Sequence, residues 1–356
     1  MAIMITDEDV RKYLPMEDCI DAMRVAFADF AEGRAKSPPR VRYISETPDP
    51  DKRYWCNVHV GAVPSYGMAC VRAGSHVIRF DPKAETGRAR SYPGPINWTV
   101  VILYDLATAE PKGFMHESYL SGMRVAATTG AVVDAAAGFE VTTLGLFGTG
   151  RQARAHAYAI SKVRPSIKTL RVFSPTKAHR NAFVDYVDLP DVEIVLCEDP
   201  RDAVDGCDII CCATASSKPV FNGDWLVDGQ FVISIANSDL NLQRYEVDET
   251  VLKRASTILI NDWDSVEFNN QIELLNLVES GDVMREKVIE IGDVFSRKVT
   301  IPKDPRAVMY YKNNSGLGMQ FAAAGAVIYD RMKDLPNNKE IPSDWLGAEA
   351  YSQGSN

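Results

Sequence analysis

Residues 142–156 read TTLGLFGTGRQARAH, and this stretch decides the fold of the chain. An apolar run typical of a strand ends at Gly148-Thr149-Gly150, and a polar run typical of a helix follows. Gly148 allows a sharp turn out of the strand, Gly150 lets a pyrophosphate approach the backbone, and the small Ala153 lets the helix pack closely on the sheet. Because a second apolar run comes after this helix, the order of elements matches the dinucleotide-binding fingerprint. We therefore expect a nucleotide-binding turn here rather than a plain βα turn.

The segment after this turn alternates short apolar runs with polar, helix-prone stretches. Short apolar strands separated by helices are typical of a parallel sheet that is covered on both faces. The expected strands are 142–147, 170–174, 193–196, 209–213, 231–235 and 257–260. The predicted fold class is therefore α/β, with a Rossmann-type doubly wound parallel sheet.

The first third of the chain has a different pattern. Residues 5–13 and 16–33 predict a strand followed by a helix with one apolar face. Apolar and polar residues then alternate, as in sheet strands, over 53–60, 68–78 and 98–104. This region is expected to form a mixed α+β unit.

The end of the chain resembles its first part in composition, because 322–328 is as rich in alanine as 128–138. We therefore expect a Rossmann domain at 120–310 that is inserted into a second, α+β domain for substrate binding and dimerisation. That second domain is predicted to comprise 1–119 and, after the insertion, 311–356, which ends in a polar tail.

Composition limits the classes of function. A chain of 356 residues with 46% hydrophobic residues can form two cores, and its net charge of −9 argues against sequence-independent nucleic-acid binding. No apolar stretch approaches the roughly 20 residues of a membrane span, and no signal-peptide pattern opens the chain. The seven cysteines lack metal-binding spacings, so no metal is expected and the thiols are predicted to be reduced. The expected location is cytoplasmic.

Five segments together carry a resemblance to a known family. They are SYLSGMRVAATTGA at 118–131, GTGRQA at 148–153, CATASSKPVF at 212–221, ISIANSDLNLQRYEVD at 233–248 and YKNNSGLGMQ at 311–320. The chain resembles the ornithine cyclodeaminase/mu-crystallin family from about residue 5 to 329, and the pair Gln152-Ala153 is more distinctive than the glycines before it. The resemblance implies chemistry on the C–N bond of a small amino or imino acid, with a nicotinamide cofactor, in a homodimer.

The resemblance also assigns residues to the substrate. Arg40 and Arg124 match the family's carboxylate-binding arginines, and a guanidinium suits a carboxylate because it binds both oxygens and keeps its charge. Arg42 is the alternative if the register shifts, and a surface salt bridge is the alternative role for each arginine. Asp239 matches the family's catalytic aspartate at the end of a strand, where it would act as a general acid or base close to the cofactor. A turn-forming role is the alternative for Asp239.

Two departures from the family bear on mechanism. Arg72 stands where the family carries a lysine, and an arginine can orient a substrate but cannot shuttle a proton at working pH. Arg72 is therefore expected to serve both catalysis and substrate binding, which puts cyclodeamination in doubt. The loop 81–95 is longer than usual and could recognise a second acidic group or a larger substrate. His76 and His116 are further candidate proton donors, with a structural role as the alternative.

The predicted cofactor-binding set includes the fingerprint and three later segments. The residues are Gly148, Thr149, Gly150, Gln152, Ala153, Ser174, Thr176, Lys177, Arg180, Thr214, Ala215 and Asp239. An NAD site normally places an acidic residue at the end of the second strand to bind the ribose 2′-hydroxyl. This chain has hydroxyl and basic residues there, at Ser174, Thr176, Lys177 and Arg180, so NADP is favoured over NAD.

The favoured function is NADPH-dependent reduction of a small imino acid, or the reverse dehydrogenation of an amino acid. One alternative is an ornithine cyclodeaminase that recycles a bound NAD. The other is a crystallin-like protein that binds the nucleotide without turnover.

Overall fold

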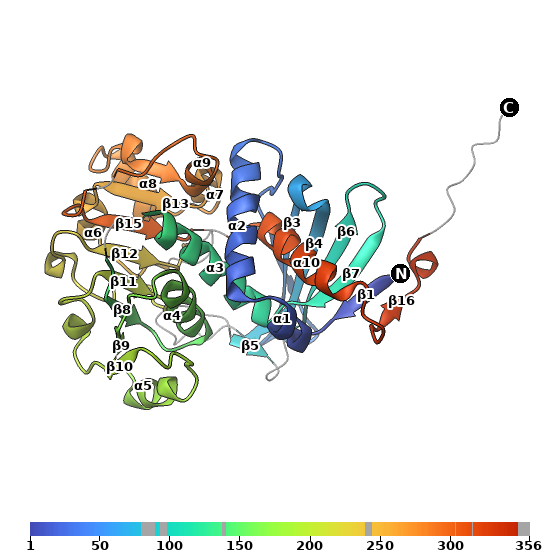
Figure 1. Cartoon of the computed structure of the whole chain (residues 1–356), viewed down its shortest axis with the longest axis horizontal. Helices are drawn as coiled ribbons and strands as arrows, with labels where there is room; N and C mark the ends of the chain where they lie inside the picture. Colours follow the sequence, from blue (N-terminus) through green and yellow to red (C-terminus); the bar gives the residue numbers. More distant parts are fainter. Residues whose placement is uncertain are drawn as a thin grey trace.

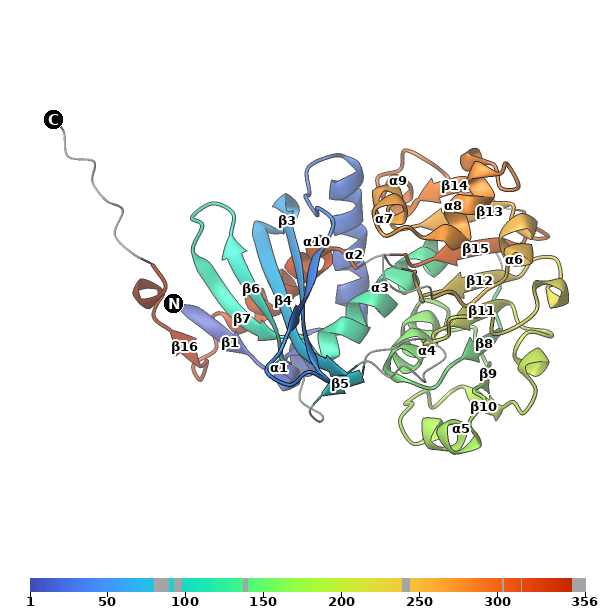
Figure 2. The ribbon, with the colours of Figure 1, turned by 180° about the vertical axis from the view of Figure 1, so that it is seen from behind.

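The structure is a computed structural model. It describes residues 1–79, 98–136, 140–238, 244–302, 304–314 and 316–347, together with the backbone of 90–92. Two β-sheets lie at opposite ends of the molecule, and helices α2 (Met16–Ala31), α3 (Tyr119–Ala136) and α10 (Gly318–Met332) lie between them (Figures 1 and 2). Among the described residues, no helix combines the length and apolarity that a bilayer span requires.

The first sheet, sheet A, is mixed and belongs to the predicted substrate-binding unit. Its strand order is β16-β1-β7-β6-β4-β3-β2, with β5 paired to β4, and only β1 and β7 run parallel. The strands are β1 (Ala2–Ile5), β2 (Val41–Glu46), β3 (Arg53–Val63), β4 (Met68–Arg79), β5 (Arg90–Tyr92), β6 (Trp98–Asp105), β7 (Pro111–His116) and β16 (Glu340–Ile341).

The opening of the chain corrects one prediction. Residues 5–13 are not a strand, because β1 ends at Ile5 and helix α1 spans Asp7–Tyr13. Thr6 caps this helix, since its hydroxyl accepts from the Asp9 backbone N–H while the Asp9 carboxylate accepts from the Thr6 backbone N–H. Such a reciprocal cap strongly favours a helix start, and its carboxylate partner is an aspartate instead of the usual glutamate.

The second sheet, sheet B, is entirely parallel and confirms the predicted doubly wound fold. Its strand order is β10-β9-β8-β11-β12-β15-β13-β14. The strands are β8 (Thr143–Phe147), β9 (Thr169–Phe173), β10 (Glu193–Leu196), β11 (Ile209–Cys212), β12 (Phe231–Ser234), β13 (Thr257–Ile260), β14 (Val288–Glu290) and β15 (Met309–Lys312). The six predicted strands are present within a residue at each end, whereas β14 and β15 were not predicted.

Helices cover both faces of sheet B and one face of sheet A. Besides α1, α2, α3 and α10, the helices are α4 (Arg151–Val163), α5 (Lys177–Val184), α6 (Glu249–Arg254), α7 (Trp263–Phe268), α8 (Ile272–Glu279) and α9 (Ile291–Phe295). One continuous core joins the two sheets, because Leu103 of sheet A, Phe27 of α2 and Leu144 of sheet B belong to the same buried cluster. The predicted domain boundaries stay a prediction.

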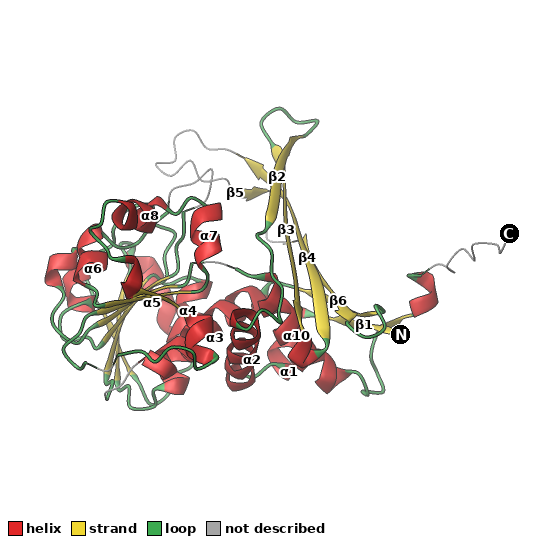
Figure 3. Ribbon diagram, turned by 90° about the horizontal axis from the view of Figure 1, so that it is seen from above, coloured by secondary structure: helices red, strands yellow, loops and turns green. Residues whose placement is uncertain are grey.

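The two faces of sheet A differ. Helices α1, α2 and α10 pack along one face, called the inner face below, and no described element covers the other, open face (Figure 3). Paired residues of an antiparallel sheet point to the same face. The pair His59–Arg72 therefore shares the inner face, and the pairs Val60–Val71 and Ala73–Val100 share the open face.

Candidate functional site

The strand order of sheet B reverses beside β8, and the nucleotide-binding turn lies there. In parallel sheets the crevice at such a reversal binds ligands at the carboxyl ends of the strands. Gly148 has a φ of +106°, and a Cβ at this position would overlap the carbonyl oxygen of Ala213. Gly150 borders open space, and α4 starts at the next residue. The turn therefore offers the free backbone N–H groups that a pyrophosphate needs.

A cavity of about 590 Å³ opens above this turn. Its lining residues are Phe147, Gly148, Thr149, Gly150, Arg151, Gln152, Phe173, Ser174, Pro175, Ala213, Thr214, Ala215, Ser216, Val220 and Arg244. Seven predicted cofactor residues thus meet in one place, namely Gly148, Thr149, Gly150, Gln152, Ser174, Thr214 and Ala215. The volume lies in the usual range for small-molecule and cofactor sites. Ala153 is fully buried below the cavity, at the expected contact of helix and sheet.

Three predicted residues after β9 do not line this cavity. The buried Arg180 donates through Nη1 to the carbonyl oxygen of Ser174. It therefore stabilises the loop after β9 without lining the cavity. Lys177 is three-quarters exposed, with its Nζ 3.9 Å from a Glu198 carboxylate oxygen. Thr176 precedes α5 as its N-cap residue and is exposed. Ser174 alone of this group faces the cavity, and no carboxylate appears among the described lining residues.

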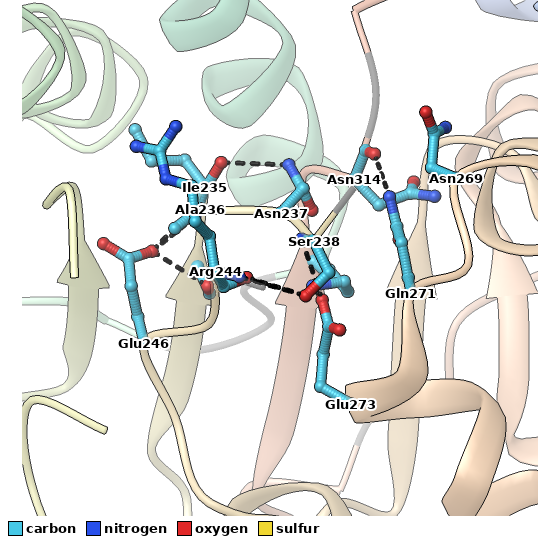
Figure 4. Close-up of polar contacts among 12 residues, drawn as sticks. Ile235, Ala236, Asn237, Ser238, Arg244, Glu246, Asn269, Gln271, Glu273 and Asn314 are labelled. Atoms are coloured by element: carbon cyan, nitrogen blue, oxygen red, sulfur yellow. Dashed lines mark hydrogen bonds and ion pairs between the residues drawn. The ribbon is translucent and has the colours of Figure 1, made fainter. Parts of the chain in front are cut away.

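Glu246 joins the loops that border the cavity, and its role was missed from the sequence. Its Oε1 accepts from the backbone N–H and hydroxyl of Thr214, at 2.5 and 2.7 Å. Its Oε2 accepts from the Ser234 hydroxyl and from the backbone N–H groups of Ile235 and Ala236, at 2.8–2.9 Å. Complete burial raises the pKa of Glu246, although these hydrogen bonds act in the opposite direction. One side chain thereby fixes the loops after β11 and β12, and Figure 4 shows it beside Ile235 and Ala236.

Arg72 lies on the inner face of sheet A and is paired with Glu117. Its Nη2 donates to Glu117 Oε2 at 2.8 Å and its Nε donates to the same oxygen at 3.3 Å. Nη1 lies 3.4 Å from His59 Nδ1. Arg72 is 8% exposed and Glu117 is fully buried. Burial lowers the pKa of His59 well below its usual range, and the positive charge of Arg72 adds to this effect, so His59 is neutral.

Arg124 is a buried cation whose described hydrogen-bond partner is a neutral amide. Its Nη1 donates to Gln320 Oε1 at 2.7 Å, and its Nε makes no hydrogen bond with any described residue. The guanidinium lies 4.5 Å from the centre of the Phe321 ring, which Arg72 and His59 also contact. Burial lowers the pKa of Arg124 to about 10. A guanidinium in this state is suited to an anionic ligand.

Arg124 also lies near the edge of sheet B that carries the nucleotide turn. The next residue, Val125, accepts a hydrogen bond from the side chain of Asn313, which directly follows β15. Gly316 makes room for the arginine, because a Cβ there would lie 2.8 Å from Arg124 Nη2. The sequence therefore folds so that the carboxyl edge of the parallel sheet and the inner face of sheet A share this arginine.

The other predicted arginines, Arg40 and Arg42, lie on the same side of sheet A as Arg72. Arg40 Nη2 donates to Asn269 Oδ1 at 3.2 Å, which links the segment before β2 to the end of α7. Arg42 has its guanidinium carbon 5.0 Å from the centre of the Trp55 ring, on the inner face. Burial and the charge of Arg72 are the largest causes of the lowered pKa of His59. The charges of Arg124, Arg40 and Arg42 lower it further, so several cations lie around one imidazole.

Asp239 and most of the loop 81–95 lie outside the described residues. Ser238, the residue before Asp239, is buried at the carboxyl end of β12, and its backbone N–H donates to Glu273 Oε1 at 3.3 Å (Figure 4). The same oxygen accepts from Lys312 Nζ at 2.7 Å. Burial raises the pKa of Glu273, but the charge and hydrogen bond of Lys312 outweigh this effect and the net pKa is lowered.

The two candidate histidines have different surroundings. His76 lies on the inner face of sheet A, four residues after Arg72 on β4. Burial is the main cause that lowers the pKa of His76, and the charge of Arg72 lowers it further. His116 Nδ1 lies 3.5 Å from an Asp7 carboxylate oxygen at the end of β7. Within the described residues, no three histidine, cysteine or acidic side chains group as metal ligands.

Comparison with known proteins agrees with this architecture. Residues 1–335 match the model of the ornithine cyclodeaminase/mu-crystallin family. The chain is 24% identical to an alanine dehydrogenase of Archaeoglobus fulgidus over 330 residues, which covers 92% of this chain and 94% of the relative. It is 25% identical to the ketimine reductase mu-crystallin of Macropus fuliginosus, over 92% of this chain and 96% of that one.

Solved structures share the whole fold. The Δ1-pyrroline-2-carboxylate reductase of Thermococcus litoralis, solved with NADH and L-proline, superposes with a TM-score of 0.80 at 19% identity and covers 95% of this chain and 100% of that one. An archaeal alanine dehydrogenase dimer with bound NAD has a TM-score of 0.77 at 21% identity, with coverages of 95% and 99%. The family model spans nearly the full length, so this chain belongs to the ornithine cyclodeaminase/mu-crystallin family.

Proposed function

We propose that the protein reduces the C=N bond of a small imino acid with NADPH, or catalyses the reverse oxidation of the amino acid. The observation that carries this proposal is the buried Arg124, whose Nε has no described hydrogen-bond partner and whose pKa is lowered to about 10 by burial. A substrate carboxylate would complete its hydrogen bonds and balance its charge. One relative is an alanine dehydrogenase, and alanine carries such a carboxylate.

The side chains around Arg124 supply the remaining functions. Arg40 and Arg72 support the same substrate, with Arg72 held in place by Glu117. Gly148, Thr149, Gly150 and their cavity neighbours would hold the cofactor, which when bound supplies or accepts a hydride. Asp239 is proposed to exchange the proton at the substrate nitrogen, at the end of a loop that Glu246 and Glu273 fix in position.

NADP is proposed over NAD because of the end of β9. Ser174 faces the cavity there, and none of the described lining residues is acidic. A carboxylate at that position would repel a 2′-phosphate, whereas a hydroxyl can donate to it. The solved relatives hold NAD or NADH, so this preference distinguishes the proposal from a simple transfer of their cofactor.

Arg72 favours reduction over cyclodeamination. Cyclodeamination needs several proton transfers around one bound imine, and a guanidinium does not release a proton at working pH. The two bonds from Arg72 to Glu117 fix the guanidinium as an orienting group. A homodimer is proposed as well, by analogy with the dimeric archaeal alanine dehydrogenase, and the exposed apolar side chains on the open face of sheet A are proposed as its interface.

A turnover assay separates the three functions. We expect repeated NADPH oxidation with preformed cyclic imino acids, or with 2-oxo acids plus ammonia or methylamine. Arg124→Met should lower kcat/KM about 30-fold or more while NADPH still binds, because loss of a buried charged contact costs about 2–5 kcal/mol. Ammonia release from ornithine without net change of the cofactor would instead establish a cyclodeaminase. Tight NADPH binding without turnover on the whole panel would establish a binding protein.

A further inference from the structure

The inner face of sheet A carries polar side chains well beyond Arg72. Cross-strand pairing places them in three successive rows on this face: His59 with Arg72, then Asn57 with Arg42 and Gly74, then Trp55 with His76. Two residues along a strand span about 7 Å, so the third row lies about 14 Å from the first. A substrate with a single carboxylate at Arg124 and Arg72 would leave the outer rows unused.

Two buried polar atoms in these outer rows are unpartnered. Trp55 Nε1 and Asn57 Oδ1 are both inaccessible to solvent, and neither forms a hydrogen bond with a described residue. Burying a polar atom without a partner costs free energy of folding, so native structures usually retain one for a reason. The indole N–H can only donate, so its natural partner is an oxygen atom.

A cation lies beside that donor. The Arg42 guanidinium carbon lies 5.0 Å from the centre of the Trp55 ring, on the same face of the sheet. Both the guanidinium and the indole N–H can donate to carboxylate oxygens. Gly74 lets the side chains of His76 and Arg72 approach each other over the middle row, because its missing Cβ position lies 3.0 Å from His76 Nε2 and 3.2 Å from Arg72 Nη1.

We propose that the substrate is an imino acid with a second carboxylate, bound by Arg42 and Trp55 Nε1, while its first carboxylate is bound by Arg124 and Arg72. This inference rests on the proposed reductase function and names its substrate class. The chemistry is unchanged: the imine carbon gains a hydride, the nitrogen gains a proton, and the reduced nicotinamide cofactor is oxidised. Because Arg42 lies in the row next to that of Arg72, about 7 Å along the strands, the site favours the longer of two short dicarboxylates.

The test compares substrates that differ in the second carboxylate. With NADPH and ammonia, the parent enzyme should have a kcat/KM at least 10-fold higher for 2-oxoglutarate than for pyruvate, with oxaloacetate between them. Arg42→Gln should lower this selectivity ratio about 10- to 100-fold, because a charge-assisted hydrogen bond is lost. Trp55→Phe should lower it about 5- to 10-fold while it keeps the ring. Arg79→Gln is the matched control, since Arg79 is exposed at the far end of β4, and its ratio should equal that of the parent.

Direct binding keeps the two proposals separable. The complex with NADPH should bind glutarate at least 10-fold more tightly than butyrate, and Arg42→Gln should remove this difference. Turnover of imino acids with no preference for a second carboxylate would overturn the present inference and leave the reductase function intact. Absence of turnover on every imine would overturn the reductase function, and the glutarate comparison would still decide whether the second carboxylate site exists. Equal binding of glutarate and butyrate would overturn that site.

Discussion

Arg72 donates to Glu117 through Nε and Nη2, and its Nη1 lies against His59. This arrangement fixes the direction of the guanidinium before any substrate binds. A fixed planar cation suits a clamp for a carboxylate, because both oxygens can be gripped at once. At the scale of single residues, the proposed substrate side of the site is therefore suited to orienting a ligand.

Replacement of Arg72 by lysine tests this role. Arg72→Lys keeps the charge but loses the planar fork, so we expect the Michaelis constant to rise more than the turnover number falls, and Arg72→Ala should be worse in both. Steady-state kinetics over a range of pH would measure this. A faster lysine variant with a new ionisation in its pH–rate profile would instead show that proton transfer at this position limits the enzyme.

Glu246 permits a second test at this scale. Glu246→Gln replaces an acceptor of five hydrogen bonds with an amide whose NH₂ group would face N–H donors. We expect the dissociation constant for NADPH to increase about 10-fold or more, since hydrogen bonds to a charged group contribute about 1.5–3 kcal/mol. Fluorescence titration would measure it, with the exposed Glu198→Gln as the control. If Glu246→Gln and Glu198→Gln bound NADPH with equal affinity, Glu246 would contribute to folding only and not to cofactor binding.

At the scale of elements, the parallel sheet was largely predictable because its strands are short apolar runs between helices. Strand β15 was missed although residues 307–311 read AVMYY, an apolar run like the strands that were predicted. Its place between β12 and β13, out of chain order, leaves no signal in the local sequence. Glu117 and His59 were missed for the same reason, since only the pairing of distant strands places them against Arg72. Arg72 and Arg124 were found because they stand at positions where the resembled family carries a lysine and a substrate-binding arginine.

Helix α4 gives a prediction for stability. His156 is fully buried there, its Nδ1 donates to the Gln152 carbonyl oxygen at 2.8 Å, and burial lowers its pKa to about 4. Below the ordinary value of about 6.5 the unfolded chain takes up a proton that the folded chain does not. Its contribution to stability is therefore fully present above about pH 6.5 and is lost as the pH falls toward 4.

The histidine can be removed to measure this effect. The free energy of unfolding of the parent should fall between pH 7 and pH 5 by about 2 kcal/mol more than that of His156→Leu, from the shift of the pKa between about 6.5 and about 4. Urea denaturation at both pH values would measure the difference. His179→Leu, on the exposed side of α5, is the control and should follow the parent. Equal pH dependence of parent and His156→Leu would mean that His156 titrates normally.

At the scale of the whole molecule, the two sheets work as one unit. Their helices share a continuous core, and Arg40 contacts Asn269 from the opposite side of the site. The open face of sheet A remains apolar, with Trp98, Val100 and Val60 exposed by 69%, 43% and 36%. A contiguous exposed apolar surface of this kind is typical of a protein–protein interface.

A second copy of the chain is the expected partner of that face. A symmetric dimer places the same patch on both subunits, so one lysine introduced at its centre is repeated across the interface. Val100→Lys should therefore shift the protein from dimer to monomer in sedimentation velocity at micromolar concentration. Val184→Lys is the matched control, because Val184 has the same 43% exposure but lies on α5 beside the other sheet. A parent protein that sediments as a monomer, or a Val100→Lys variant that stays dimeric, would show that the open face of sheet A does not form the interface.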